Sequence, residues 1–193
     1  SNRTLMADVG IVQSDVCSNI RKSGPVPASA ITRVRESGGH KDALLGAMKM
    51  CDYSNYTWQI LPEQSLNLGI MSAYQVLILP AVYHVSERLE ADLLAYVKEG
   101  GCLIADGQCG LYDRQGERQE TYTLNTLFGC DYISPHQRYE ASEWSGYLKP
   151  SEDRLWRYIP PTTPPIGSTR YLVDLMDDLI IQANFVNPAT DIS

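Results

Sequence analysis

The sequence predicts an α/β protein with an open, mostly parallel sheet and helices on both of its faces. Two observations favour this class. Tyr74 to Leu79 form a nearly unbroken apolar run, and residues 74–105 follow a strand, helix, strand pattern with short connections. An unbroken apolar run is typical of a strand covered on both faces. Two strands joined in this way by one helix form a right-handed βαβ unit.

Two strands and a helix are expected in the first part of the chain. Residues 5–12 are rich in β-formers and precede Gln13-Ser14-Asp15, which favours a turn. The polar stretch 18–40, with several Gly and Pro, predicts a long loop with room for one short helix. Within 41–51 the apolar side chains have helical spacing, and 58–61 predicts a short strand stopped by Pro62.

The βαβ unit has clear boundaries in the sequence. Pro80 ends the first strand, Ser86 is placed to cap the helix, and Gly100-Gly101 supplies its left-handed stop. The apolar stripe of this helix consists of Leu89, Leu93, Leu94 and Val97. Cys102–Ala105 then forms the second strand.

The remaining sequence predicts weaker elements. A short helix is expected at 123–128, an edge strand at 131–133 and a stiff Pro-rich segment at 160–165. Residues 172–180 have helical spacing, and a strand at 179–181 is the alternative. We therefore expect an α/β domain over 1–133 and an aromatic, Pro-rich extension over 134–193 packed on it. The two ends suggest a fragment of a larger multidomain protein.

Composition excludes several classes of protein. The chain has 193 residues, 44% of them hydrophobic, and a net charge of −7. It is long enough for a sizeable core but too short for a (β/α)₈ barrel of roughly 200–250 residues with this tail. No cationic cluster suits phosphates, and no apolar run can cross a bilayer. We therefore expect a soluble protein without nucleic-acid or membrane partners.

Five cysteines are present, an odd number without C-x-x-C spacing. This pattern predicts neither a disulfide framework nor a zinc knuckle. Cys51, Cys102 and Cys130 have apolar neighbours and are expected to be buried. Unpaired cysteines favour a cytoplasmic location, although the sequence does not fix the compartment.

Candidate site residues follow the predicted strands, because ligands of open parallel sheets bind at the carboxyl ends of the strands. They are Gln13, Ser14, Asp15, Tyr83, His84 and residues 106–109. One hypothesis is a Cys109 nucleophile with His84 or His136 as base and Asp106 as orienting group. The residues after Cys109 predict a turn, so no helix N-terminus lowers the thiol pKa. A turn cysteine is the favoured alternative.

The sequence lacks the residue spacing that phosphate-binding loops, metal sites and glycosidase carboxylate pairs require. The glycines match no phosphate-binding loop, and His40, His84 and His136 are scattered. No carboxylate pair suits glycoside hydrolysis. We expect no catalytic residue, metal or cofactor in this chain. Trp144, Tyr147 and Trp156 either stack on a sugar or partner, or seal the edge of the sheet.

Several motifs in the middle of the chain resemble a known family. They are YQVLILP at 74–80, VSE at 85–87, YVKEGG at 96–101, GLYD at 110–113 and LNTLFG at 124–129. Together with the opening strand they are similar to the trimerisation domain of family 42 glycoside hydrolases, the β-galactosidases. That fold is shared with the class I glutamine amidotransferase-like superfamily. The resemblance covers about residues 5–133.

The resemblance implies a flavodoxin-like domain without catalytic residues, which follows a catalytic barrel and helps to assemble a trimer. An amidotransferase nucleophile would follow Pro80, where Ala81 and Val82 stand, so glutaminase activity is not implied. The 18–40 insertion and the tail beyond 150 depart from the family pattern. The predicted function is a non-catalytic oligomerisation domain of a glycoside hydrolase in carbohydrate metabolism. The alternatives are a thiol enzyme using Cys109 and a carbohydrate-binding module using the aromatic residues.

Overall fold

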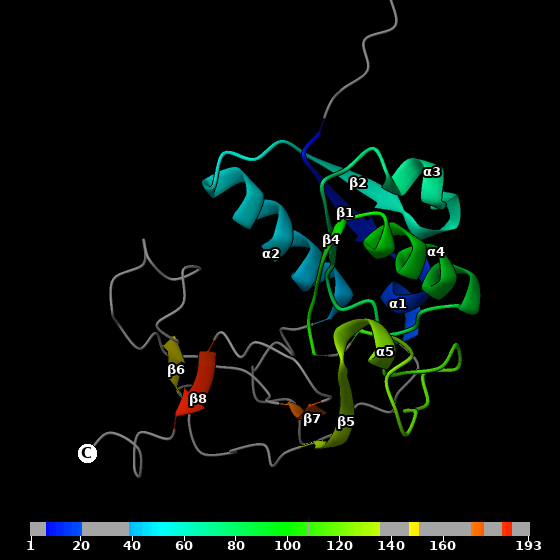
Figure 1. Cartoon of the computed structure of the whole chain (residues 1–193), viewed down its shortest axis with the longest axis vertical. Helices are drawn as coiled ribbons and strands as arrows, with labels where there is room; N and C mark the ends of the chain where they lie inside the picture. Colours follow the sequence, from blue (N-terminus) through cyan, green and yellow to red (C-terminus); the bar gives the residue numbers. More distant parts are fainter. Residues whose placement is uncertain are drawn as a thin grey trace, which may run out of the picture. The chain divides into compact units, whose positions relative to one another are not determined.

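The chain divides into two compact units, Ser1–Phe128 and Gly129–Ser193, seen in a computed structural model (Figure 1). The structure describes residues 7–20, 39–107, 109–135, 147–150, 171–175 and 183–186. The Pro-rich segment expected at 160–165 and the alternative strand at 179–181 lie outside these ranges. Within them, no helix has the length and apolar character needed to span a membrane.

A parallel sheet of four strands, in the order β2-β1-β3-β4, forms the centre of the first unit. The strands are β1 (Val9–Gln13), β2 (Trp58–Pro62), β3 (Val76–Leu79) and β4 (Cys102–Ala105). Ile11 lies opposite Ile60 and Ile78, and Ile78 lies opposite Ile104. The predicted α/β class is therefore confirmed.

Five short or medium helices and one 3₁₀ turn are found in the described part of this unit. They are α1 (Asp15–Ile20), α2 (His40–Tyr53), η2 (Glu63–Ser65), α3 (Leu68–Met71), α4 (Glu87–Lys98) and α5 (Asn125–Phe128). All of them except α5, which follows β4, lie between its strands. The expected cap of α4 is present, because the Leu89 N–H donates to Ser86 Oγ at 3.3 Å. Gly100 follows with φ of +98°, the predicted left-handed stop.

Helices pack on both faces of the sheet. Successive strand residues point to opposite faces, so β3 divides its side chains between two apolar clusters. One cluster joins Leu77 and Leu79 to Leu89 and Leu93 of α4, and the other joins Ile78 to α2. This arrangement confirms the predicted two-sided cover.

The fully buried stripe of α4 consists of Leu89, Leu93 and Tyr96, so it shares only Leu89 and Leu93 with the predicted stripe. Tyr96 is only 2% exposed, whereas the predicted Leu94 and Val97 are half-buried. The Tyr96 hydroxyl lies within hydrogen-bond distance of two backbone oxygens, Tyr74 O at 3.1 Å and Cys102 O at 3.3 Å. Burial of this side chain is tolerated because its polar end is satisfied.

The turn expected at residues 13–15 is instead the start of α1. Ser14 Oγ accepts the Cys17 N–H at 3.1 Å, and Asp15 opens the helix. Ser and Asp favour turns and helix N-termini for the same reason, since their short polar side chains accept nearby backbone N–H groups. The local sequence therefore could not separate the two outcomes.

Cys102 is exposed, so its predicted burial is wrong. β4 is an edge strand of the described sheet, and its pairing with β3 puts Cys102 and Ile104 on the face that α2 covers. The cluster under α2 reaches β3 but does not include these two residues, and Ile104 is 46% exposed. Cys51 is buried as expected, and Cys130 is half-buried.

In the second unit, two antiparallel strand pairs are described. β5 (Cys130–Pro135) pairs with β7 (Tyr171–Leu175), and β6 (Tyr147–Pro150) pairs with β8 (Ala183–Val186). The strand expected at 131–133 is confirmed. The helix expected over 172–180 is wrong at its start, because residues 171–175 form a strand. Its apolar spacing suits both structures, and pairing with β5 decides between them.

Candidate functional site

A buried histidine ties together two strand ends at the carboxyl edge of the sheet. His40 is 2% exposed; its Nε2 accepts the Ser14 N–H at 2.9 Å, and its Nδ1 lies 2.7 Å from Pro80 O. Because Nε2 accepts a hydrogen bond, the ring proton is on Nδ1, which donates to the Pro80 carbonyl. The neutral ring thus links the end of β1 to the end of β3. His40 is one residue before the helix predicted at 41–51. Its helical spacing from the buried Ala47 and Cys51 was the available signal that it lies on the inner face of α2.

The chain turns sharply at Ala81, just after β3. Ala81 has φ of +48°, a left-handed conformation that costs a residue with a Cβ about 1–2 kcal/mol. Its N–H donates to Asp106 Oδ2 at 2.5 Å, and the residue is 3% exposed. Ala81 stands where the amidotransferase resemblance would place a nucleophile, and its methyl side chain cannot act as one. Ala81 thus has a left-handed backbone conformation and no nucleophilic side chain.

Cys109 lies in the interior behind this elbow. It is 2% exposed, and its thiol donates to Leu79 O at 2.9 Å and lies 3.7 Å from Asp106 Oδ1. Burial, followed by the charge of Asp106, raises the pKa of the Cys109 thiol well above its ordinary value. The thiol is therefore protonated at neutral pH and inaccessible, which argues against a nucleophilic role.

His84 lies beside a different cysteine. Its backbone N–H donates to Cys17 Sγ at 3.4 Å, and its buried Nδ1 has no hydrogen-bond partner among the described residues. Burial raises the pKa of the Cys17 thiol. The structure thus brings Asp106 to Ala81 and Cys109, and His84 to Cys17. His136, Trp144 and Trp156 lie outside the described residues, and Tyr147 is placed only as the first residue of β6.

The other candidate residues at the carboxyl edge are buried, half-buried or in contact with neighbouring side chains of the fold. Ser14 is buried, Tyr83 packs edge-on against Tyr112 with ring centroids 5.7 Å apart, and Asp15 accepts the Gln64 side-chain amide at 3.0 Å. Gln13 ends β1 and is half-buried. Within the described ranges, no group of three His, Cys, Asp or Glu side chains could hold a metal ion.

A hollow of about 390 Å³ lies at the opposite, amino edge of the sheet. Its lining comes from the segments before β3 and β4: Ser72, Tyr74, Gln75, Tyr96, Glu99, Gly100 and Gly101. Tyr74 OH donates to Gln59 Oε1 at 2.9 Å, and Ser72 Oγ donates to Leu68 O at 2.8 Å. These hydroxyl groups are thus engaged in the fold, and the hollow is separate from the sequence-predicted candidates.

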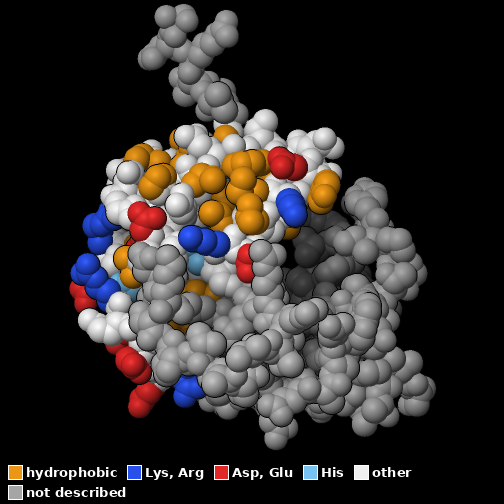
Figure 2. All heavy atoms as spheres, turned by 180° about the vertical axis from the view of Figure 1, so that it is seen from behind, with side chains coloured by type: hydrophobic (Ala, Val, Ile, Leu, Met, Phe, Trp, Pro, Cys, Tyr) orange, Lys and Arg blue, Asp and Glu red, His pale blue; other side chains and the backbone are white. Residues whose placement is uncertain are grey.

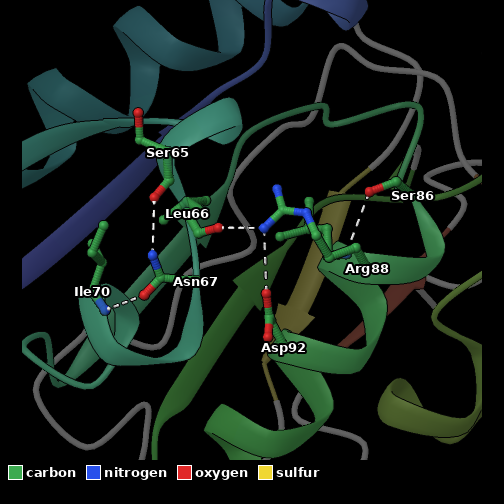
Figure 3. Close-up of polar contacts among 8 residues, drawn as sticks. Ser65, Leu66, Asn67, Ile70, Ser86, Arg88 and Asp92 are labelled. Atoms are coloured by element: carbon green, nitrogen blue, oxygen red, sulfur yellow. Dashed lines mark hydrogen bonds and ion pairs between the residues drawn. The ribbon is translucent and has the colours of Figure 1, made fainter.

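Polar contacts at the start of α3 and along α4 also have a structural role (Figure 3). Arg88 reaches from α4 and donates to Leu66 O at 2.6 Å, with Asp92 3.6 Å away on the same helix. Asn67 caps α3 by accepting the Ile70 N–H at 3.1 Å. The ion pair is half-exposed and contributes little, whereas the bond to the Leu66 carbonyl holds the loop before α3 against α4.

The described part of the first unit is therefore a parallel α/β domain in which structural hydrogen bonds join the strand ends and the candidate nucleophile is buried. The sequence model of the β-galactosidase trimerisation domain matches residues 67–131. This match confirms the family resemblance over the segment from the cap of α3 to the start of β5. The matched segment is about a third of the chain.

Solved structures show the same fold at low sequence identity. A catalytic mutant of Gan42B, a family 42 β-galactosidase from G. stearothermophilus, is 16% identical with a TM-score of 0.70, covering 96% of this chain and 24% of that one. A β-galactosidase from Bacillus circulans sp. alkalophilus is 14% identical with a TM-score of 0.73, covering 93% and 25%. An α-L-fucosidase from Paenibacillus thiaminolyticus is 18% identical with a TM-score of 0.61, covering 94% and 23%.

This chain spans about a quarter of the length of each of these enzymes. A comparison with curated proteins found no match.

Proposed function

We propose that this chain is a non-catalytic oligomerisation domain of a larger glycoside hydrolase of the β-galactosidase type. The observation that carries the proposal is the match of residues 67–131 to a trimerisation domain. The structural similarity to a β-galactosidase supports the proposal, because it covers nearly the whole of this chain but only a quarter of that enzyme. Because this chain corresponds to only a quarter of such an enzyme, we place the catalytic carboxylates in another part of the enzyme.

The geometry of the carboxyl edge supports a non-catalytic role. In an amidotransferase-like domain the elbow after β3 would present the nucleophile, and here it carries Ala81 with φ of +48°. The nearby thiol of Cys109 is buried and donates a hydrogen bond to the Leu79 carbonyl oxygen. These two facts favour the accessory domain over the thiol enzyme.

The strand order supports the finer assignment of the fold. The order β2-β1-β3-β4 equals the first four positions of the flavodoxin-like order 2-1-3-4-5. The expected boundary at 133 falls inside β5, which pairs with β7, so we propose that the α/β domain ends before β5 and that the extension begins with this strand. The proposed partners are further copies of this chain, in a trimer, and the catalytic barrel of the parent enzyme. The likeness to an α-L-fucosidase means that the fold does not select the sugar.

Two measurements test this function. The purified 193-residue chain is assayed with a chromogenic β-galactoside before and after repurification, and its mass is measured by light scattering. We expect self-association and no hydrolysis above the blank. Hydrolysis that survives repurification refutes the non-catalytic role. Sequencing the flanking DNA adds an independent test, because the parent gene should encode a barrel of at least about 200–250 residues before this domain.

A further inference from the structure

We propose that the outward face of α2 is a surface on which copies of this chain associate. This inference rests on the proposed oligomerisation function and assigns it a location. The outer α2 surface comprises Leu45, Met50 and Tyr53, together with Tyr56 just beyond the helix. All four belong to the most exposed large hydrophobic side chains of the described residues, with 52%, 49%, 84% and 59% of their surface exposed.

Large apolar side chains lie on both sides of the helix, and the outer side also carries Lys41, Asp42, Lys49 and Asp52. Ala47 and Cys51 are buried, and Leu44 and Met48 pack beside them against the sheet. Because an α-helix has 3.6 residues per turn, Leu45 and Tyr53 lie on the side away from this cluster. A helix with one buried face usually carries polar residues on the other. The described core clusters do not include Leu45, Met50 or Tyr53, so packing within the described part of this unit does not account for these side chains.

The exposed area is sufficient for an interface. At about 200 Å² for a fully exposed large side chain, the four residues present about 500 Å² of side-chain surface. A standard interface buries about 800 Å² per partner, of which about 60% is apolar. The outer α2 surface thus matches the apolar share of one partner. Figure 2 shows hydrophobic side chains gathered on one side of the described part of the chain, with charged groups at the edges of the patch.

Charge favours a second copy as the occupant. The chain carries a net charge of −7, so two copies repel one another when they approach through most of their surfaces. The exposed charges of α2 itself are Lys41, Asp42, Lys49 and Asp52, which sum to zero. Like-charge repulsion from this face is therefore small, whichever surface of the next copy it meets in a ring of three.

Gly46 provides a sensitive position for testing this surface. It lies in the middle of α2, and a Cβ added there would have no atom within 4 Å. A large side chain at this position therefore extends outward without disturbing the core. It would, however, hold a second copy away from the outer α2 surface.

The test is sedimentation of the full chain over a wide range of concentrations. We expect the wild-type chain to associate, and Leu45→Glu/Tyr53→Glu and Gly46→Arg each to weaken association by about tenfold or more, as for other interface hot spots. Ala91→Glu, on the exposed side of α4, is the matched control and should associate like wild type. Far-UV circular dichroism and thermal unfolding establish that each variant is folded.

Each outcome supports or overturns the proposal. A wild-type chain that remains monomeric overturns both this surface and the proposed self-association. Folded variants that associate as strongly as wild type overturn this surface alone and leave the oligomerisation function in place. A loss of association in the α2 variants but not in Ala91→Glu supports it. Hydrolysis by the isolated chain is measured separately and bears only on the proposed non-catalytic role.

Discussion

Replacing His40 with leucine tests whether the link between β1 and β3 stabilises the domain. Leucine has a similar size and removes both hydrogen bonds of the imidazole, to the Ser14 N–H and the Pro80 carbonyl. Ser14 is fully buried and Pro80 is also buried, so water cannot replace the lost partner without opening the edge of the sheet. The substitution therefore leaves a donor and an acceptor unpaired.

The expected loss is a large part of the stability of a domain. Each unpaired buried group costs about 1–3 kcal/mol, and the added apolar surface of leucine offsets part of the sum. We expect His40→Leu to lower the free energy of unfolding by about 2–4 kcal/mol. Typical domains have only about 5–15 kcal/mol in total.

Urea unfolding followed by far-UV circular dichroism measures this change. With a slope of about 2 kcal/mol per molar urea, the midpoint should fall by about 1–2 M without a change of slope. His84→Leu is the matched control, because the buried His84 Nδ1 has no hydrogen-bond partner among the described residues. The control should change the free energy by less than about 1 kcal/mol. A His40→Leu chain within about 0.5 kcal/mol of wild type would refute the structural role of this histidine.

Three further predictions concern thiols and glycines. Iodoacetamide at neutral pH should label the exposed Cys102 well before the buried Cys109, and the reverse order on mass spectrometry would contradict the burial of Cys109. Because burial raises the pKa of Cys109, the unfolded chain loses that proton near pH 8.5 while the folded chain keeps it, so stability should fall above this pH. The loss of stability above this pH should be smaller in Cys109→Ala than in wild type. If the urea midpoints of the two chains change equally with pH, the buried thiol does not cause the loss. Gly101→Ala should cost about 1–3 kcal/mol, because its Cβ would overlap the Tyr96 ring, whereas Gly46→Ala, in open space, should stabilise the chain by up to about 1 kcal/mol. Thermal unfolding compares the two, and equal melting temperatures would contradict the packing around Gly101.

The βαβ unit could be predicted because its signals are local. The apolar run before Pro80, the Ser86 cap and the Gly100 stop each act within a few residues of where they stand. The motifs of the same stretch also carry the family resemblance, and the family match at 67–131 falls on it. Where sequence and structure agree, backbone chemistry and side-chain period favour the same element.

The candidate site depended on contacts between distant residues. His40 joins Ser14, 26 positions away, to Pro80, 40 positions away, and no spacing rule connects these three. The left-handed Ala81 likewise depends on Asp106, which lies on the neighbouring strand end. Such contacts arise only when the strands pair, so the sequence could name Asp106 as a candidate without revealing its partner.

The sequence by itself determined the fold class, the boundaries of the central βαβ unit and the absence of a nucleophile after Pro80. Tertiary structure decided the exposure of Cys102 and the strand at 171–175. The exposure of Cys102 follows from where α2 ends its cover of the sheet, and the strand follows from pairing with β5. Burial and strand pairing are properties of neighbours in space, and local propensity is too weak to fix them.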